Sequence, residues 1–203
     1  MADFLLDNFN GTEALTGHVP DTGSAWALRN GGPSLSQIAG GVVKNTSTFE
    51  VDSNGTTPPS PDYEVEFTWK QLISGFSDGQ MYVVIRGTGS NDTDANWYFF
   101  ENRGSQFRIN RRALAVYTQI GTEWNNTPAV DQVLTGKISV SGSALELYVD
   151  GVLRCSGTDA NITGAGQVYL LLANGRVEIQ SLHAAGIAIP TLYVTRNPMR
   201  IGV

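Results

Sequence analysis

The sequence has little of what several protein classes require. Of its 203 residues, one is a cysteine and three are lysines, and charged residues make up 16%, against about 25% in a typical soluble domain. The lone Cys155 excludes an intramolecular disulfide and therefore a disulfide-stapled scaffold. The scarcity of lysine and the lack of any long heptad pattern exclude a coiled coil or helical bundle.

The chain also lacks long apolar runs and an excess of positive charge. No stretch of about 18 apolar residues is present, so no membrane-spanning helix is expected. A net charge of -6 gives no general attraction to phosphates, so no nucleic-acid partner is expected. The first residues carry no basic region, and Asp3 and Asp7 bracket a short apolar stretch. We therefore expect no signal peptide and synthesis in the cytoplasm.

Glycine and aromatic residues are plentiful. The 23 glycines, four Trp, seven Tyr and eight Phe predict many tight turns around a substantial core. Short β-type runs alternate with turn signals, which is typical of an all-β sandwich or barrel. The runs are 62–70, 81–86, 97–100, 107–110, 137–140, 145–149, 168–172 and 176–182. A short helical turn is expected at 131–134.

Two patterns within these runs are specific. Tyr63, Val65, Phe67 and Trp69 alternate with polar residues, which places them on one buried face of a strand. Asp150-Gly151 supplies the two positive-φ positions of a type I′ turn, which predicts a hairpin over 144–155. We also expect Trp26 to be in the core.

Aromatic residues flanked by amides form the candidate ligand site. Carbohydrate sites combine an aromatic platform with hydrogen-bonding side chains, and two segments have this composition. Trp124 with Asn125 and Asn126 lies in a polar stretch and is the stronger candidate, although an exposed Trp124 equally fits an assembly contact. Asn96 and Trp97 form the second segment, in which Trp97 leads into an aromatic strand and favours a core position.

The order of several motifs resembles one fold family. Asp7-Asn8-Phe9 with Gly11, His18 and Trp26, then 63–66, Arg86, Trp97-Tyr98, 147–151, Asp159 and 164–168, is similar to the concanavalin A-like (laminin G-like) jelly-roll domains of bacteriophage virion proteins. The resemblance implies a two-sheet antiparallel jelly-roll sandwich over residues 1–187. Residues 188–203 would then be a C-terminal arm or extra strand. It does not by itself imply an activity.

Glycosidases of the same jelly-roll type use carboxylates spaced along one strand. Asp62, Glu64 and Glu66 lie on one strand face, about 7 Å apart along the chain. The pattern departs from that of the glycosidases, because Glu64 stands where they have an aspartate and Asp62 directly follows Pro61. We expect a solvated strand face there and no catalytic residues, with hydrolysis as the less favoured alternative.

Other candidate chemistry is weak. Asp92 with Asp94 and Asp52 with Asn54 offer oxygen ligands for Ca²⁺ but fit Asx turns equally well, so no metal or other cofactor is expected. Four arginines, at 103, 108, 111 and 112, fit a solvated or salt-bridged surface better than a phosphate site. Cys155 is expected to be a buried strand residue and not a nucleophile.

These observations favour a non-enzymatic structural protein of a bacteriophage virion. A capsid decoration or head-fibre component comes first, and a tail-associated adhesin that binds host surface carbohydrate is the alternative. The expected partners are other virion proteins or further copies of the chain, contacted through residues 187–203, together with a host glycan.

Overall fold

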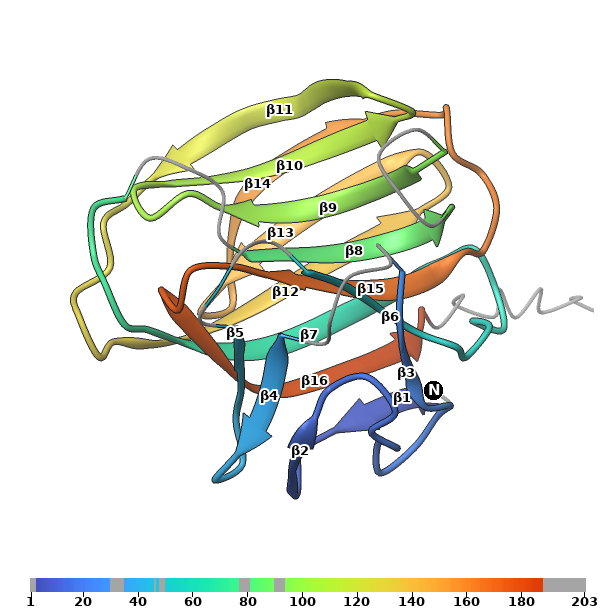
Figure 1. Cartoon of the computed structure of the whole chain (residues 1–203). Coiled ribbons are helices and arrows are strands. Elements are labelled where there is room, and N and C mark those ends of the chain that lie inside the picture. The colour runs from blue at the N-terminus through green and yellow to red at the C-terminus, as the bar shows by residue number, and fades with distance from the viewer. Residues whose placement is uncertain are drawn as a thin grey trace, which may run out of the picture.

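The structure, a computed structural model, describes residues 3–29, 35–45, 47, 50–76, 81–89 and 94–187. These residues form two antiparallel sheets packed face to face (Figure 1). The predicted two-sheet all-β sandwich is therefore confirmed. Within the described residues there is no helix of the length and apolar character needed to cross a membrane.

One sheet has nine strands and the other has seven. Across the nine-stranded sheet lie β14 (Val152–Thr158), β13 (Ala144–Val149), β12 (Val133–Ser141), β7 (Tyr63–Gln71), β16 (Val177–Gly186), β5 (Val43–Asn45), β4 (Ser36–Ala39) and β2 (Thr12–Ala14), and β1 (Asp3–Asp7) pairs with β16. Across the seven-stranded sheet lie β11 (Val116–Asn125), β10 (Gln106–Ala113), β9 (Asn96–Asn102), β8 (Met81–Thr88), β15 (Gln167–Leu172), β6 (Glu50–Asn54) and β3 (Trp26–Leu28).

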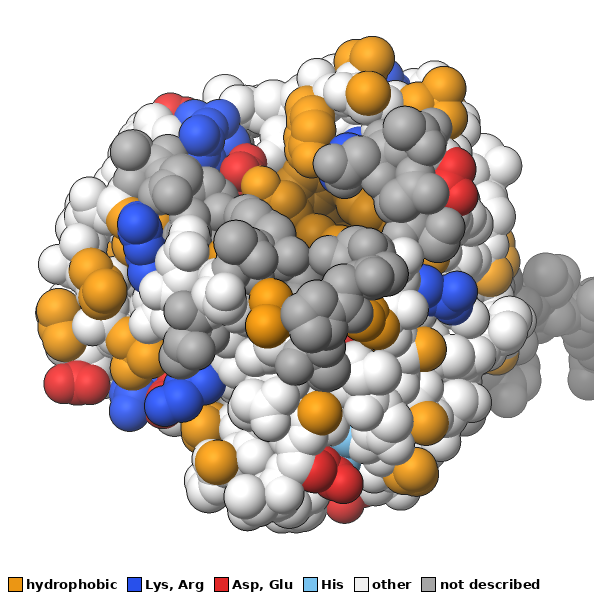
Figure 2. Space-filling view, viewed as in Figure 1, with side chains coloured by type: hydrophobic (Ala, Val, Ile, Leu, Met, Phe, Trp, Pro, Cys, Tyr) orange, Lys and Arg blue, Asp and Glu red, His pale blue; other side chains and the backbone are white. Residues whose placement is uncertain are grey.

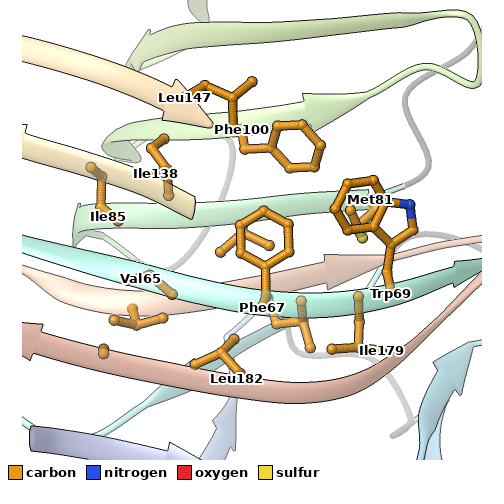
Figure 3. Close-up of a cluster of buried hydrophobic side chains, with 14 of the residues drawn as sticks. Val65, Phe67, Trp69, Met81, Ile85, Phe100, Ile138, Leu147, Ile179 and Leu182 are labelled. Atoms are coloured by element: carbon orange, nitrogen blue, oxygen red, sulfur yellow. The ribbon is translucent and has the colours of Figure 1, made fainter. Parts of the chain in front are cut away.

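The main core fills the space between the sheets (Figure 3). The four alternating residues of β7 are each at most 1% exposed, as the sequence predicts. Among them, Phe67 meets Phe100 of the opposite sheet with ring centroids 5.2 Å apart, and Trp69 lies 5.7 Å from the same ring. Trp26 is also in the core, at 1% exposure. Aromatic contacts of this kind join the two sheets.

Two local predictions have opposite outcomes. The hairpin over 144–155 is confirmed, and its turn residues Asp150 and Gly151 have φ values of 50° and 74°. The helical turn at 131–134 is wrong: Asp131 has φ 64°, outside the right-handed helical region, and β12 begins at Val133. The predicted arm at 188–203 lies outside the described residues.

A buried histidine ties the first strands together. His18, 5% exposed, lies with Nδ1 2.7 Å from Glu13 Oε1 and Nε2 3.1 Å from Asp7 Oδ1. Trp26 donates from Nε1 to the other oxygen of Asp7, at 2.7 Å. Burial lowers the pKa of His18, but the hydrogen bonds to Glu13 and Asp7 outweigh it and raise the pKa above its usual value. The charged imidazole is thus the form that the fold favours.

Stability should therefore depend on pH through His18. The folded pKa lies above the value of about 6.5 in the unfolded chain, so the contribution is complete below that pH and is lost as pH rises through the folded pKa. Urea unfolding of the wild type and His18→Gln at about pH 6 and about pH 8.5 measures it. We expect the free-energy difference between the two proteins to shrink at the higher pH, and a difference independent of pH would contradict the prediction.

A buried guanidinium holds the loops at one end of the sandwich. Arg86, 2% exposed, donates to the carbonyl oxygens of Pro61 and Ile162, at 2.9 and 2.7 Å, and to Asp62 Oδ1 at 3.1 Å. Its backbone has φ 51° and its N–H donates to the hydroxyl of Tyr63. Arg86 thus connects the end of β8 to the segment before β7 and to the segment before β15.

Arg86→Met should destabilise the fold strongly. The substitution keeps much of the side-chain volume but leaves two buried carbonyls and a carboxylate without their donor, at a cost of about 3 kcal/mol. Lys137→Met is the control, because Lys137 pairs with Glu64 at 3.2 Å on a partly exposed surface, where such pairs contribute about 0–1 kcal/mol. Urea unfolding compares them, and equal losses would refute the role given to Arg86.

Candidate functional site

The outer face of the seven-stranded sheet, turned away from the main core, carries its own apolar cluster. The cluster contains Val51, Val84, Ala95, Trp97, Phe99, Tyr169 and Leu171. Figure 2 shows a hollow over β9 and its neighbours with hydrophobic side chains on its floor. Because apolar residues line both faces of these strands, the outer face differs from the polar face expected of a solvated sandwich.

Polar side chains extend this face toward β11. Strand pairing sets Tyr82 beside Glu101 and Glu101 beside Arg108, and Arg108 contacts Glu123 at 2.8 Å. Glu101 is 8% exposed and accepts a hydrogen bond of 2.7 Å from Asn110. Burial raises the pKa of Glu101. The outer face therefore combines aromatic surface with a row of charged and amide groups.

Arg112 joins the apolar and polar parts. Its guanidinium lies 5.4 Å from the ring centroid of Trp97 and 4.9 Å from that of Tyr117, and it donates to the carbonyl of Leu114 at 3.1 Å. These cation–π contacts hold the two rings in place. Tyr117 is 51% exposed, so this end of the face presents an accessible aromatic ring.

A cavity of about 350 Å³ opens beside this face at the loop end of the sheet. Its lining comes from separate segments: Arg29, Thr57, Gly87, Thr88, Gly89, Asp94, Gly166, Gln167 and Tyr169. Tyr169 belongs to the apolar cluster and meets Trp97 edge-on at 5.4 Å, while its hydroxyl donates to Gly89 O at 2.8 Å. Tyr169 therefore links the cavity to the apolar cluster on the outer face of the seven-stranded sheet.

Close backbone approach shapes the cavity wall. A Cβ at Gly166 would lie 2.2 Å from the carbonyl carbon of Arg86, and a Cβ at Gly89 would lie 2.4 Å from Asp94 O. Both glycines also have positive φ, 48° and 87°. No other residue fits these two positions without moving the loops. The cavity wall therefore requires glycine at both positions and the hydrogen bonds by which Arg86 holds the neighbouring segments.

The predicted site residues separate into two places. Asn96 begins β9 next to Asp94 and donates to its carbonyl at 3.2 Å. Trp97 is 1% exposed, so it supports Tyr169 from within the cluster and offers no platform of its own. Both therefore lie beside the cavity. They form a supporting layer, and the burial of Trp97 confirms the core position that its place before an aromatic strand favours.

Trp124 lies elsewhere, at the end of β11. Its ring stacks on Phe107, with centroids 5.1 Å apart, and the guanidinium of Arg154 covers it at 4.4 Å. The strand partners of Trp97 and Trp124 are Arg112 and Phe107, which are five residues apart on β10, about 17 Å. The two predicted segments thus do not form one site. Asn125 is exposed, and Asn126 donates from its backbone to Ser105 O at 3.1 Å.

The carboxylates of β7 lie on the opposite side of the molecule. Glu64 and Glu66 project from the nine-stranded sheet, where Glu64 pairs with Lys137 at 3.2 Å and Glu66 lies 4.0 Å from His183. Asp62 accepts hydrogen bonds from Arg86 and from Gly142 N, at 2.9 Å for the latter. Glu64 and Glu66 are thus engaged in ion pairs away from the cavity, whereas Asp62, one residue before β7, belongs to the Arg86 junction beside it.

The remaining candidates have structural partners. Asp52 accepts a hydrogen bond from Thr16 Oγ1, and Asn54 accepts one from Thr56 N; both lie in β6. Asp92 lies outside the described residues. No cluster of three or more acidic, histidine or cysteine ligands occurs in the described part of the chain. Cys155 is buried and burial raises its pKa, consistent with a strand residue. Arg111 pairs with Asp159.

No local pattern in the sequence marks the residues that line the cavity. Arg29 follows β3, Asp94 precedes β9, and Gln167 and Tyr169 belong to β15. Strand order alone brings these segments together, because β15 lies between β8 and β6, and β6 pairs with β3. The Gly164–Gly166 and Gly87–Gly89 repeats were the nearest available sign of close backbone approach.

Comparison with known proteins defines the fold class. No protein-family model matches the chain, and no curated protein matches its sequence. Carbohydrate-binding module CBM66 from Bacillus subtilis matches with a TM-score of 0.64 and 15% identity, over 86% of this chain and 98% of that one. A structure from work on endo-acting O-glycanases of the human gut microbiota that initiate mucin breakdown matches with a TM-score of 0.66 and 10% identity, over 92% and 100%.

The exoplasmic/lumenal domain of VIP36, bound to Ca²⁺ and Man3GlcNAc, also matches, with a TM-score of 0.63 and 9% identity over 81% of this chain and 84% of that one. At these identities the likeness concerns the fold. The chain has the jelly-roll, concanavalin A-like sandwich that these lectin and carbohydrate-binding structures share.

Proposed function

We propose that this protein is a non-enzymatic carbohydrate-binding sandwich whose ligand occupies the cavity at the loop end of the seven-stranded sheet. The observation that carries the proposal is the composition of the cavity. A guanidinium, a carboxylate, an amide and two threonine hydroxyls converge there beside a tyrosine ring. Its volume of about 350 Å³ falls within the range of small-molecule sites and has room for a sugar ring.

Sugars have the chemistry that such a site recognises. Each ring carries several hydroxyl groups that both donate and accept hydrogen bonds, and it has apolar C–H faces that pack on aromatic rings. Asp94 accepts, Arg29 donates, and Gln167 and Thr88 do both. The neighbouring outer face, with Tyr82 and Tyr117, extends the aromatic surface for further rings of a longer glycan.

The absence of hydrolysis is part of the proposal. A retaining glycosidase requires two carboxyl groups about 5–5.5 Å apart at the scissile bond. Among the described residues that line the cavity, Asp94 supplies the one carboxylate. Glu64 and Glu66 lie on the other sheet in contact with Lys137 and His183. This arrangement supports binding without bond cleavage.

Glycan binding should weaken when the cavity is altered. A glycan array first identifies the ligand, and calorimetry then compares wild type with Asp94→Asn. Loss of a charged hydrogen bond to a sugar hydroxyl is expected to lower affinity about tenfold or more. Asp131→Asn is the matched control, because Asp131 has a side chain that is 76% exposed and lies outside the cavity.

Three results would count against this assignment. Binding to no glycan at all would remove the function. Unchanged binding by Asp94→Asn together with loss of binding by Trp124→Phe would move the site to the end of β11. Release of reducing sugar from the bound glycan, above the level in buffer, would replace binding with hydrolysis.

We also propose that the protein works as a bacteriophage virion component, a capsid decoration or head-fibre protein or else a tail adhesin. This proposal is supported by the sequence resemblance and by exposed apolar side chains. Leu114, Val116 and Tyr117 at the β10–β11 hairpin are 55%, 62% and 51% exposed. Exposed apolar groups gathered at one tip are typical of contact surfaces.

We expect the protein to be present in purified particles and to be absent from them when residues 188–203 are removed. Immunogold labelling of particles locates it on head or tail, and mass spectrometry measures its amount. Far-UV circular dichroism of the shortened chain shows whether the sandwich still folds. Particles without the protein would refute the virion role, and full incorporation of a folded, shortened chain would refute the role of the arm.

A further inference from the structure

We propose that the cavity selects an acidic sugar and that Arg29 binds the carboxylate of this sugar. The inference rests on the proposed glycan-binding function and adds the chemical class of the ligand. It starts from the position of one guanidinium. Arg29 directly follows β3, and its backbone N–H donates to Val51 O at 2.8 Å, which fixes the start of the side chain at the cavity wall.

Neutral groups hold the Arg29 side chain in place. Nε donates to the hydroxyl of Ser53, and Nη2 donates to Oε1 of Gln167 at 2.7 Å. The Gln167 amide is itself fixed, because its Nε2 donates to Gly55 O at 3.3 Å. A guanidinium has five N–H donors in a planar fork, so these two side-chain contacts orient the group without using all its donors. The orientation is therefore set before a ligand arrives.

The charge of Arg29 has no carboxylate partner among the described residues. Asp94 lines the same cavity, but no ion pair joins it to Arg29 in the described part of the chain. Two arginines elsewhere on this face do have one: Arg108 pairs with Glu123 at 2.8 Å, and Arg103, in the β9–β10 turn, lies 3.7 Å from Glu101. A partly buried cation is stabilised by an anion in contact with it. A ligand carboxylate, which matches the guanidinium fork, would supply that anion.

The rest of the cavity suits the other groups of the same sugar. Asp94 would repel a carboxylate but accepts hydrogen bonds from hydroxyl groups, so the two charges give the ligand one orientation. The hydroxyls of Thr57 and Thr88 offer further hydrogen bonds. An acidic sugar carries both kinds of group, a carboxylate for Arg29 and hydroxyls for Asp94. A neutral sugar would bring no anion to the guanidinium.

Matched pairs of glycans test this selectivity. The probes are trigalacturonate with its methyl ester and sialyllactose with the methyl ester of its sialic acid, so that the members of each pair differ in the charge of the carboxyl group. Calorimetry with wild type should show at least one acidic member binding about tenfold or more tighter than its neutral counterpart, the value expected for hydrogen bonds to a charged group. That preference should shrink as salt is added.

Arg29→Gln should remove the preference. We expect it to lower affinity for the acidic member about tenfold or more and to leave the neutral member within about twofold. Lys44→Gln makes the same change in net charge on an exposed position of the nine-stranded sheet and should change neither. Thermal unfolding of each variant confirms that it is folded.

The outcomes separate this inference from the function it rests on. Equal binding of acidic and neutral members, or an equal loss for both in Arg29→Gln, overturns acidic selectivity while glycan binding stands. The same loss in Lys44→Gln would show a general effect of charge and would also overturn it. If neither the probes nor the wider array binds, the proposed function itself fails.

Discussion

The end of the sandwich that carries the cavity depends on the buried guanidinium of Arg86. Its side chain satisfies the carbonyls of Pro61 and Ile162 and the carboxylate of Asp62, so three chain segments must meet there for its charge to be compensated. Its backbone adopts φ 51°, within the irregularity between Ile85 and Thr88 in the pairing of β8 with β9. Gly166 then packs against that backbone. The cavity is the space left beside this junction.

A second constraint is that the seven-stranded sheet is apolar on both faces. Its inner face packs on β7 and its neighbours, while its outer face carries Trp97, Phe99 and Tyr169 at no more than 2% exposure. Such strands read as continuous apolar runs, as in MYVVIR at 81–86. The alternation that makes β7 easy to recognise is absent there for the same reason. The outer face therefore packs an aromatic cluster of its own and borders the cavity.

These constraints explain which parts of the structure the sequence could predict. Strand β7 and the turn at Asp150-Gly151 are local patterns, one of alternation and one of backbone preference, and both were recognised. The short strands β2 to β5 consist of three or four residues each and are defined by their partners, so no local pattern marks them. Trp97 illustrates the limit, because the aromatic residues that follow it favour a core position, while its contact with Tyr169, 72 positions away, has no local signal.

The residues that line the cavity could not be predicted from the sequence, for a related reason. Arg29 and Gln167 are separated by 138 positions, and strand order brings them into contact through the pairing of β15 with β6 and of β6 with β3. By contrast, Asp62, Glu64 and Glu66 are conspicuous in the sequence because they alternate along one short run of residues. Their positions on the nine-stranded sheet and at the Arg86 junction give them ion-pairing roles. The spacing of carboxylates along the chain therefore does not locate the cavity, because Glu64 and Glu66 lie on the nine-stranded sheet and the cavity lies at the seven-stranded one.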